Sequence, residues 1–198
     1  MIKQIVTFLF LLYSSSSIAA DNFNLYLVRH AEKQANIANP ALTACGQQRA
    51  KQLATMLAKA DIKAIYSTSY NRTMATAKPL ALKNNLSIQH YDPRSLSALA
   101  KQLRKNKQNV LIVGHSNTTP QLAALLSNKK VATKKQSSHI TSSTQKDEAV
   151  IFPLSENDYQ MLYQIQFING EVSLTLLQQP LQCSLNKTQS KKAQRKLG

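Results

Sequence analysis

Short apolar runs alternate with helix-like segments between residues 23 and 126, and this alternation constrains the fold most strongly. The apolar runs predict buried strands at 23–28, 62–66, 87–91 and 110–113. Apolar residues spaced three and four apart predict helices at 43–58, 70–83, 96–103 and 121–126, the first of them capped by Thr43. Strands that alternate with helices are typical of a three-layer α/β/α sandwich with a mostly parallel mixed sheet.

The pattern changes after residue 126. Residues 127–148 are rich in Lys, Ser, Thr and Gln and lack apolar periodicity, which predicts a flexible loop. Strands are predicted again at 149–153, 159–168 and 172–177. Asn169-Gly170 lies between the last two, and this dipeptide is a strong signal for a hairpin turn.

The N-terminal twenty residues have the organisation of a secretory signal peptide. Lys3 precedes an apolar core at 5–13, and small residues lead to Ala20. The apolar run is too short to span a bilayer. We therefore expect a periplasmic or secreted protein with a signal peptide at 1–20, one domain at 21–181 and a basic, flexible tail at 182–198. An oxidising compartment permits a disulfide between Cys45 and Cys183, but the sequence does not decide whether it forms.

The formal net charge is +16, which indicates anionic partners such as phosphorylated substrates, an anionic envelope surface or nucleic acid. Much of the charge lies in two clusters, Lys129, Lys130, Lys134, Lys135 and Lys146, and Lys187, Lys191, Lys192, Arg195 and Lys196. Such clusters are also typical of solvated segments. No aromatic residues interleave with them, so no specific nucleic-acid binding is indicated. The oligomeric state is not readable.

Polar side chains follow the predicted strands at the edge where open α/β sheets bind ligands. They are Arg29 and His30 after the first strand, Ser67 to Arg72 after the second, Asp92 after the third, and His115, Ser116 and Asn117 after the fourth. Arginine binds phosphate through two parallel hydrogen bonds, and a neutral imidazole is a competent nucleophile. The set therefore predicts a site for a phosphoryl group. It contains no metal-type cluster of Cys or Asp, and no glycine-rich nucleotide loop is present.

Three segments in this order, VRHAEK, STSYNRTMATAKPLA and VLIVGHSNTTP, resemble the histidine phosphatase superfamily, also called phosphoglycerate mutase-like. The helix LTACGQQRAKQLA also matches. The resemblance covers 24–126 and extends less closely to 177. It implies that His30 is the phosphorylated nucleophile, that Arg29 and Arg72 bind the phosphate, and that His115 lies beside it. Asn36 is similar to a phosphate-contacting asparagine of the mutase-like branch, and Ser116 and Asn117 are candidate substrate-binding residues.

The chain also departs from the superfamily pattern. Ala31 stands where many members have glycine, and the acidic segment of the mutases, similar to GEWEG, is missing. The proton donor is therefore open between Asp92, which follows the third strand, and Glu148, which ends the predicted loop. Glu32 is interpreted as a structural carboxylate.

These features predict a metal-independent phosphomonoester hydrolase that works through a phosphohistidine on His30 and needs no cofactor. The expected substrate is a phosphorylated small molecule or an envelope phosphate, with a possible attraction to anionic membrane surfaces. Three alternatives stay open: a phosphohistidine or phosphoprotein phosphatase, a phosphoglycerate mutase-type phosphotransferase, and a non-catalytic binder of phosphorylated envelope glycans or lipids. A serine nucleophile at Ser116 is disfavoured because no G-x-S-x-G elbow is present.

Overall fold

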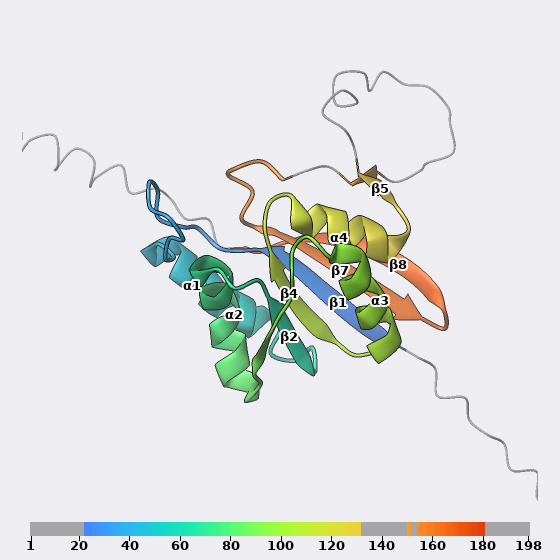
Figure 1. Cartoon of the computed structure of the whole chain (residues 1–198). Helices are drawn as coiled ribbons and strands as arrows, with labels where there is room; N and C mark the ends of the chain where they lie inside the picture. The colour runs from blue at the N-terminus through green and yellow to red at the C-terminus, as the bar shows by residue number, and fades with distance from the viewer. Residues whose placement is uncertain (1–21, 132–149, 152–153, 181–198) are drawn as a thin grey trace, which may run out of the picture.

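The computed structural model describes residues 22–131, 150–151 and 154–180 (Figure 1). The predicted signal peptide, most of the predicted loop at 127–148, the tail at 182–198 and Cys183 lie outside these residues. No helix in the described ranges has both the length and the apolar character needed to cross a membrane.

A six-stranded sheet forms the centre of the protein. Its strands are β1 (Phe23–Arg29), β2 (Ala64–Ser67), β3 (Ile88–His90), β4 (Val110–Gly114), β7 (Met161–Ile168) and β8 (Glu171–Gln178). They lie in the order β3-β2-β4-β1-β7-β8. The first four run parallel, whereas β7 and β8 are antiparallel to their neighbours. A small separate sheet pairs β5 (Lys130–Val131) with β6 (Val150–Ile151).

Two helices cover each face of the large sheet (Figure 1). The helices α1 (Ala44–Met56) and α2 (Asn71–Asn84) lie on one face, and α3 (Leu96–Asn106) and α4 (Thr118–Ser127) lie on the other. Alternate residues of β1 face the two layers. Tyr26 and Val28 belong to the core of α1 and α2, whereas Leu25 and Leu27 belong to the core of α3 and α4. Burial on both sides explains the unbroken apolar run, and the predicted three-layer α/β/α sandwich is confirmed.

Several boundaries differ by two or three residues from the sequence-based expectation, and two differences have a clear cause. Helix α4 begins at Thr118, three residues before the predicted start at 121. Its first turn is Thr118-Thr119-Pro120, and these residue types have low helix propensity, although proline is tolerated in a first turn. The short strand β5 lies inside the predicted loop at 127–148, because two residues are too few to leave a periodic pattern.

The hairpin between β7 and β8 forms where the sequence predicts it. Asn169 and Gly170 both have positive φ, 51° and 86°, and Ile168 pairs with Glu171 across the turn. Positive φ at both central residues suits the right-handed twist of the two strands, and Asn and Gly adopt it at low cost.

Candidate active site

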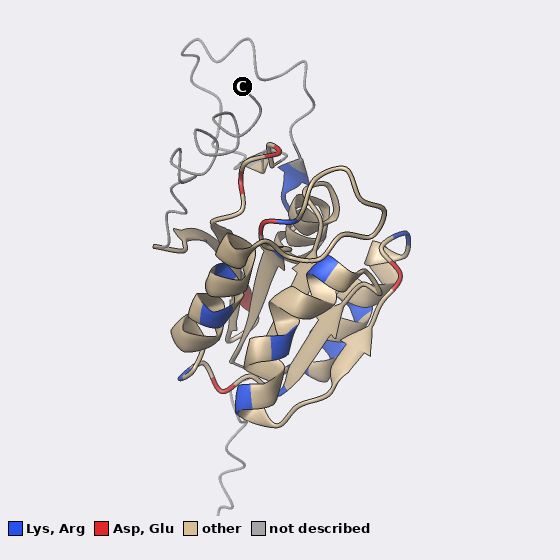
Figure 2. Ribbon diagram, turned by 90° about the vertical axis from the view of Figure 1, so that its left-hand side faces the viewer, with Lys and Arg blue, Asp and Glu red and all other residues tan. Residues whose placement is uncertain are grey.

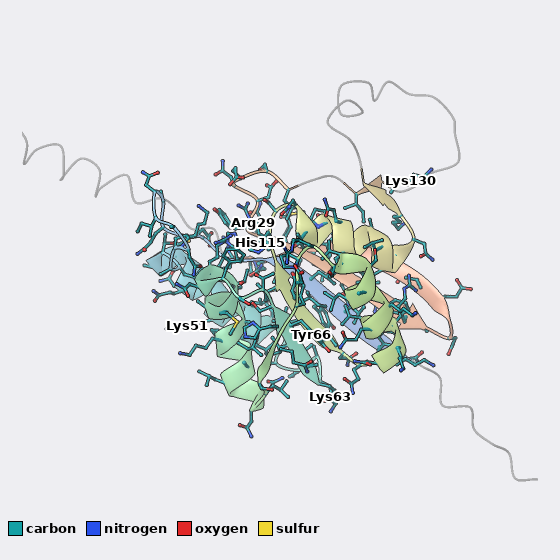
Figure 3. The ribbon with its side chains drawn as sticks, in the orientation of Figure 1. Arg29, Lys51, Lys63, Tyr66, His115 and Lys130 are labelled. Carbon is teal, nitrogen blue, oxygen red and sulfur yellow. The ribbon has the colours of Figure 1, made fainter. Side chains whose placement is uncertain are left out.

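The first and fourth strands bring Arg29, His30 and His115 together. β1 and β4 are parallel neighbours, with Arg29 in register with Gly114, and the His30 N–H donates to the Gly114 carbonyl at 2.9 Å. The two histidine rings consequently lie with centroids 5.6 Å apart. Figure 3 shows Arg29 and His115 close together at the end of the sheet where both strands stop.

This crevice is the switch point of the sheet. The chain leaves β1 through α1 and α2 on one face and reaches β4 through α3 on the other, so the connections diverge between these two strands. A pocket of about 440 Å³ opens there, and Arg29, His30, Arg72 and His115 all line it. The structure thus brings the four central residues of the predicted site into one cavity.

His30 is held as a neutral imidazole. Its side chain is buried, and Nδ1 lies 2.8 Å from the Ala31 carbonyl oxygen. A carbonyl only accepts hydrogen bonds, so Nδ1 carries the proton and the lone pair is on Nε2. Burial, with smaller contributions from the positive Arg29 and Arg72, lowers the pKa of His30 to about 3, against the raising effect of the Ala31 hydrogen bond. The imidazole is therefore uncharged at neutral pH, with one proton on Nδ1 and none on Nε2.

Helix α2 is hydrogen-bonded to the chain segment directly after His30. The Ala31 N–H donates to Thr76 Oγ1 at 2.9 Å, and that hydroxyl donates to the Arg72 carbonyl at 2.7 Å. One threonine thus connects the backbone beside His30 to the backbone of Arg72. The side chain of Ala31 is completely buried, which fits a small residue at this position.

Arg29 lies below the surface with most of its donors occupied by the loop before β7. Nη1 donates to the Ser155 and Glu156 carbonyls at 2.8 and 3.0 Å, and Nη2 pairs with the Glu156 carboxylate at 3.2 Å. The guanidinium also stacks on the Tyr159 ring at 4.3 Å. Nε is buried and has no hydrogen-bond partner among the described residues.

Arg72 faces the same pocket from the first turn of α2. Its guanidinium lies 4.4 Å from the centre of the Tyr70 ring, and Nη2 lies 3.4 Å from His115 Nδ1. Its Nε, like that of Arg29, is buried without a partner in the described chain. Both arginines line one pocket, and two guanidinium groups there suit the binding of an oxyanion.

His115 is oriented by a chain of buried hydroxyls. Its Nε2 lies 3.0 Å from Thr68 Oγ1, which lies 2.9 Å from Thr73 Oγ1. The Thr73 hydroxyl lies 2.8 Å from the Tyr70 carbonyl, its acceptor. Arg72 approaches Nδ1 as a donor, so in this geometry the proton is on Nε2 and points to Thr68. Burial, Arg72 and Arg29 lower the pKa of His115 to about 4.

The other predicted site residues are not all in the pocket. Ser116 and Asn117 line it. Asn36 is exposed in a left-handed conformation (φ 58°) and is not part of the lining. Asp92 is also outside the lining and pairs with Arg94 at 3.0 Å, because the chain after β3 turns this carboxylate towards its near neighbour. Glu148, the other candidate proton donor, is not among the described residues.

Some residues of the site were missed by the sequence analysis. Glu156 lines the pocket and pairs with Arg29, and Tyr159 and Tyr70 stack on the two arginines. Glu156 and Tyr159 follow a segment without periodicity, so no sequence signal linked them to the site. Tyr70 lies inside the second matching segment and could have been found there. Glu32 forms a bidentate pair with the buried Arg49, which agrees with its interpretation as a structural carboxylate.

The acidic groups of the site do not form a metal-binding cluster within the described ranges. No group of three His, Cys, Asp or Glu side chains there has an arrangement that would hold a metal ion. The pocket instead presents two imidazoles and two guanidinium groups, together with Lys33 and Arg94. This donor set suits a phosphoryl group.

Comparisons with known proteins agree with this geometry. Residues 25–94, which include Arg29, His30 and Arg72, match the family model described as histidine phosphatase superfamily (branch 1). No curated protein sequence matches the chain significantly.

Solved structures share the fold at low sequence identity. The protein histidine phosphatase SixA complexed with tungstate has a TM-score of 0.55 and 15% identity, over 78% of this chain and 96% of that one. The α-ribazole phosphatase from Shigella flexneri has a TM-score of 0.58 and 17% identity, over 78% and 96%. A phosphoserine phosphatase from Entamoeba histolytica with phosphoserine has a TM-score of 0.53 and 14% identity, over 80% and 97%. The matched segment and the shared fold together confirm the predicted resemblance to the histidine phosphatase superfamily.

Proposed function

We propose that this chain hydrolyses phosphomonoesters without a metal ion, through a phosphohistidine on His30. The observation that carries the proposal is the pocket that a neutral His30, two arginines and a second histidine line together. Phosphoryl transfer needs mainly positioning and electrostatic stabilisation, and these four side chains supply both.

In the first step the Nε2 lone pair of His30 attacks phosphorus while the bond from phosphorus to the leaving oxygen breaks. Nδ1 keeps its proton and donates it in a hydrogen bond to the Ala31 carbonyl, so the ring stays oriented as positive charge develops on the imidazole. The guanidinium groups of Arg29 and Arg72 bind the equatorial oxygens, and His115 lies beside them. In the second step water attacks phosphorus, the P–N bond breaks, and inorganic phosphate leaves with His30 restored.

The carboxylates support one alternative in particular, a phosphohistidine or phosphoprotein phosphatase. Glu156 is the only acidic residue in the described lining, and it is paired with Arg29. Asp92 is paired with Arg94, whose hydrogen bond lowers the pKa of Asp92 and so favours the ionised form. An alkoxide leaving group needs an acid, whereas an imidazole can take its proton from solvent on its second nitrogen. Among the described lining residues no acid is unpaired, and a site of this kind favours the better leaving group.

Hydrolysis of an aryl phosphate by the mature protein, with EDTA present, tests the main proposal. We expect metal-independent turnover that is lost in His30→Ala and kept in His90→Ala, since His90 lies on the exposed edge strand β3. Acid-labile, base-stable labelling of the wild type would identify the phosphohistidine. Activity that persists in His30→Ala, or that EDTA abolishes, would contradict the mechanism.

Comparing phosphohistidine with a phosphoserine peptide separates the two phosphatase functions. If the absence of a free acid decides specificity, kcat should be larger for phosphohistidine and should change little in Glu156→Gln. A large loss of kcat for the serine ester alone in Glu156→Gln would instead identify Glu156 as its acid.

We also propose that the chain is exported, on the basis of the signal-peptide pattern at 1–20. N-terminal sequencing of the protein from cell fractions is the direct measurement. A mature N-terminus next to Ala20 in the periplasm or medium is expected, and an intact Met1 in the cytoplasm would contradict export. Lys and Arg are spread over several helices of the described domain (Figure 2), so a general attraction to anionic surfaces is part of the same proposal.

A further inference from the structure

A groove continues from the candidate active site along the helical layer of α3 and α4. It has a volume of about 660 Å³ and shares Pro93 and Arg94 with the catalytic pocket. One wall is the beginning of α3, with Leu96 and Ser97. The two cavities are therefore neighbouring parts of one surface depression, and Arg94 lies at their junction.

The opposite wall is one face of α4. Gln121, Ala124, Leu125 and Asn128 line it at helical spacing, and Leu125 is 42% exposed. Lys129 ends the groove just beyond the helix. Helix α4 begins at Thr118, three residues after His115, and has ten residues, which corresponds to a length of about 15 Å. Figure 3 agrees with this direction, because Lys130, the sequence neighbour of Lys129, lies at the end of α4 remote from His115.

Arg94 is held at the junction by Asp92, one of the two carboxylates that the sequence offers as the acid. Its Nε and Nη2 both donate to Asp92, at 3.0 Å each, and its backbone N–H donates to the same carboxylate at 2.9 Å. Two of the three guanidinium nitrogens thus face Asp92, and Nη1 is available to another acceptor. The side chain of Arg94 is 89% exposed, so this pairing fixes its direction without contributing much to the core.

The groove has a cation at each end, an apolar residue on each wall, and no acidic residue in its described lining. Resting on the proposed function, we propose that it binds the leaving group of the substrate, and that this group is elongated and carries a second anionic substituent. The phosphoryl group is held by Arg29 and Arg72, and the second anion binds Arg94 or, in a longer substrate, Lys129. Asp92 is in this view a positioning residue for Arg94.

Binding of non-hydrolysable phosphonates tests the proposed groove without requiring catalytic turnover. We would titrate the full mature chain by calorimetry with ω-carboxyalkyl phosphonates of increasing length and with their methyl esters, at constant ionic strength. The wild type should bind the carboxylate about three- to tenfold more tightly than the ester of equal length, a size expected for a partly exposed charge-assisted contact. The preference should disappear in Arg94→Gln for short chains and in Lys129→Gln for long ones. Lys51→Gln, on the exposed side of α1 (Figure 3), is the matched control and should keep the preference for the carboxylate over the ester.

Hydrolysis of the matching phosphate esters then separates the roles of Asp92. If Asp92 positions Arg94, Asp92→Asn should reduce the preference for the carboxylate, mainly through KM. If Asp92 is the proton donor, kcat should fall equally for carboxylate and ester and phosphonate binding should not change, which would overturn the positioning role. Equal binding of carboxylate and ester by the wild type would contradict the proposed role of the groove. A preference for the carboxylate that survives both Arg94→Gln and Lys129→Gln would contradict it as well. Preferential binding without hydrolysis of any ester would support the groove and contradict the proposed enzyme.

Discussion

The charge state of His30 and His115 is decided by single residues around them. Both rings are removed from water and lie near the positive Arg29 and Arg72, and both effects disfavour a second positive charge. The hydrogen bond from His30 to the Ala31 carbonyl then leaves the lone pair on Nε2. Burial therefore keeps the ring uncharged, and one backbone carbonyl orients it, as the proposed attack on phosphorus requires.

A consequence at the residue scale is activity at low pH. Protonation of His30 blocks attack, but its pKa of about 3 and the pKa of about 4 for His115 keep both rings neutral well below the ordinary histidine range. We expect the kcat/KM profile for an aryl phosphate to show no limb near pH 6.5 that belongs to either histidine. The only ionisation expected near pH 6 is that of the substrate phosphate, and a ring-fluorinated aryl phosphate with a lower second pKa should move that limb. A limb that stays near 6.5 with both substrates would contradict the low pKa values.

We expect Thr68 to affect catalysis indirectly, through its hydrogen bond with His115. Thr68→Val keeps the shape but removes the partner of His115 Nε2, and such supporting hydrogen bonds typically change activity about 10- to 100-fold. The loss should appear in kcat rather than in the thermal midpoint. Thr55→Val is the control, because Thr55 is exposed on α1 and bonds only to the Lys51 carbonyl. Equal kinetics in the two variants would show that the hydroxyl chain has no role.

At the scale of elements, α1 is locked against the segment that leaves β1. Gly46 lies so close to the Glu32 carbonyl that a Cβ there would collide with backbone, and Glu32 in turn pairs with Arg49 on the same helix. Thr43 caps the helix by accepting from the Gly46 N–H at 3.1 Å. The backbone two residues after His30 is therefore set by the packing of α1.

Gly46→Ala tests this contact. The expected change in the free energy of unfolding has the opposite sign to the change that helix propensity alone predicts. Alanine in a helix is favoured over glycine by about 1 kcal/mol, yet the collision with Glu32 should cost about 1–3 kcal/mol and lower the free energy of unfolding. Urea unfolding of the variant beside Gln47→Ala, at an exposed position of the same helix, gives the comparison. A more stable Gly46→Ala protein would mean that α1 and Glu32 move apart at no cost.

At the scale of the whole molecule, the two histidines link folding to pH. Their pKa values are lowered in the folded protein to about 3 and about 4, whereas an unfolded histidine has a pKa of about 6.5. Between these values the unfolded chain binds more protons, so stability falls as pH falls from about 6.5 to about 4. Above pH 6.5 both states are neutral and the two groups contribute no pH dependence.

Thermal midpoints across this range test the linkage. The decline between pH 6.5 and 4 should be shallower in His30→Asn and His115→Asn than in the wild type, because each variant lacks one group that must stay neutral. His90→Asn, on the exposed strand β3, should follow the wild type. Identical slopes in all four proteins would show that other groups govern the acid sensitivity.

The sequence alone determined the layers of the fold and the central residues of the site. Unbroken apolar runs predict strands buried on both faces, and polar residues directly after parallel strands must meet at one edge. Arg29, His30, Arg72 and His115 were therefore predictable as a group. The beginning of α4 was not predictable, because threonine and proline have low helix propensity and occupy its first turn.

Only the tertiary structure decided how the carboxylates are paired. Asp92 was predicted beside the phosphate from its place after β3, yet a turn of two residues directs it to Arg94. Glu156 reaches Arg29 from 127 positions away through a loop without pattern. The physical reason is that strand and helix positions follow from local periodicity, whereas the direction of a loop side chain depends on contacts between segments distant in sequence.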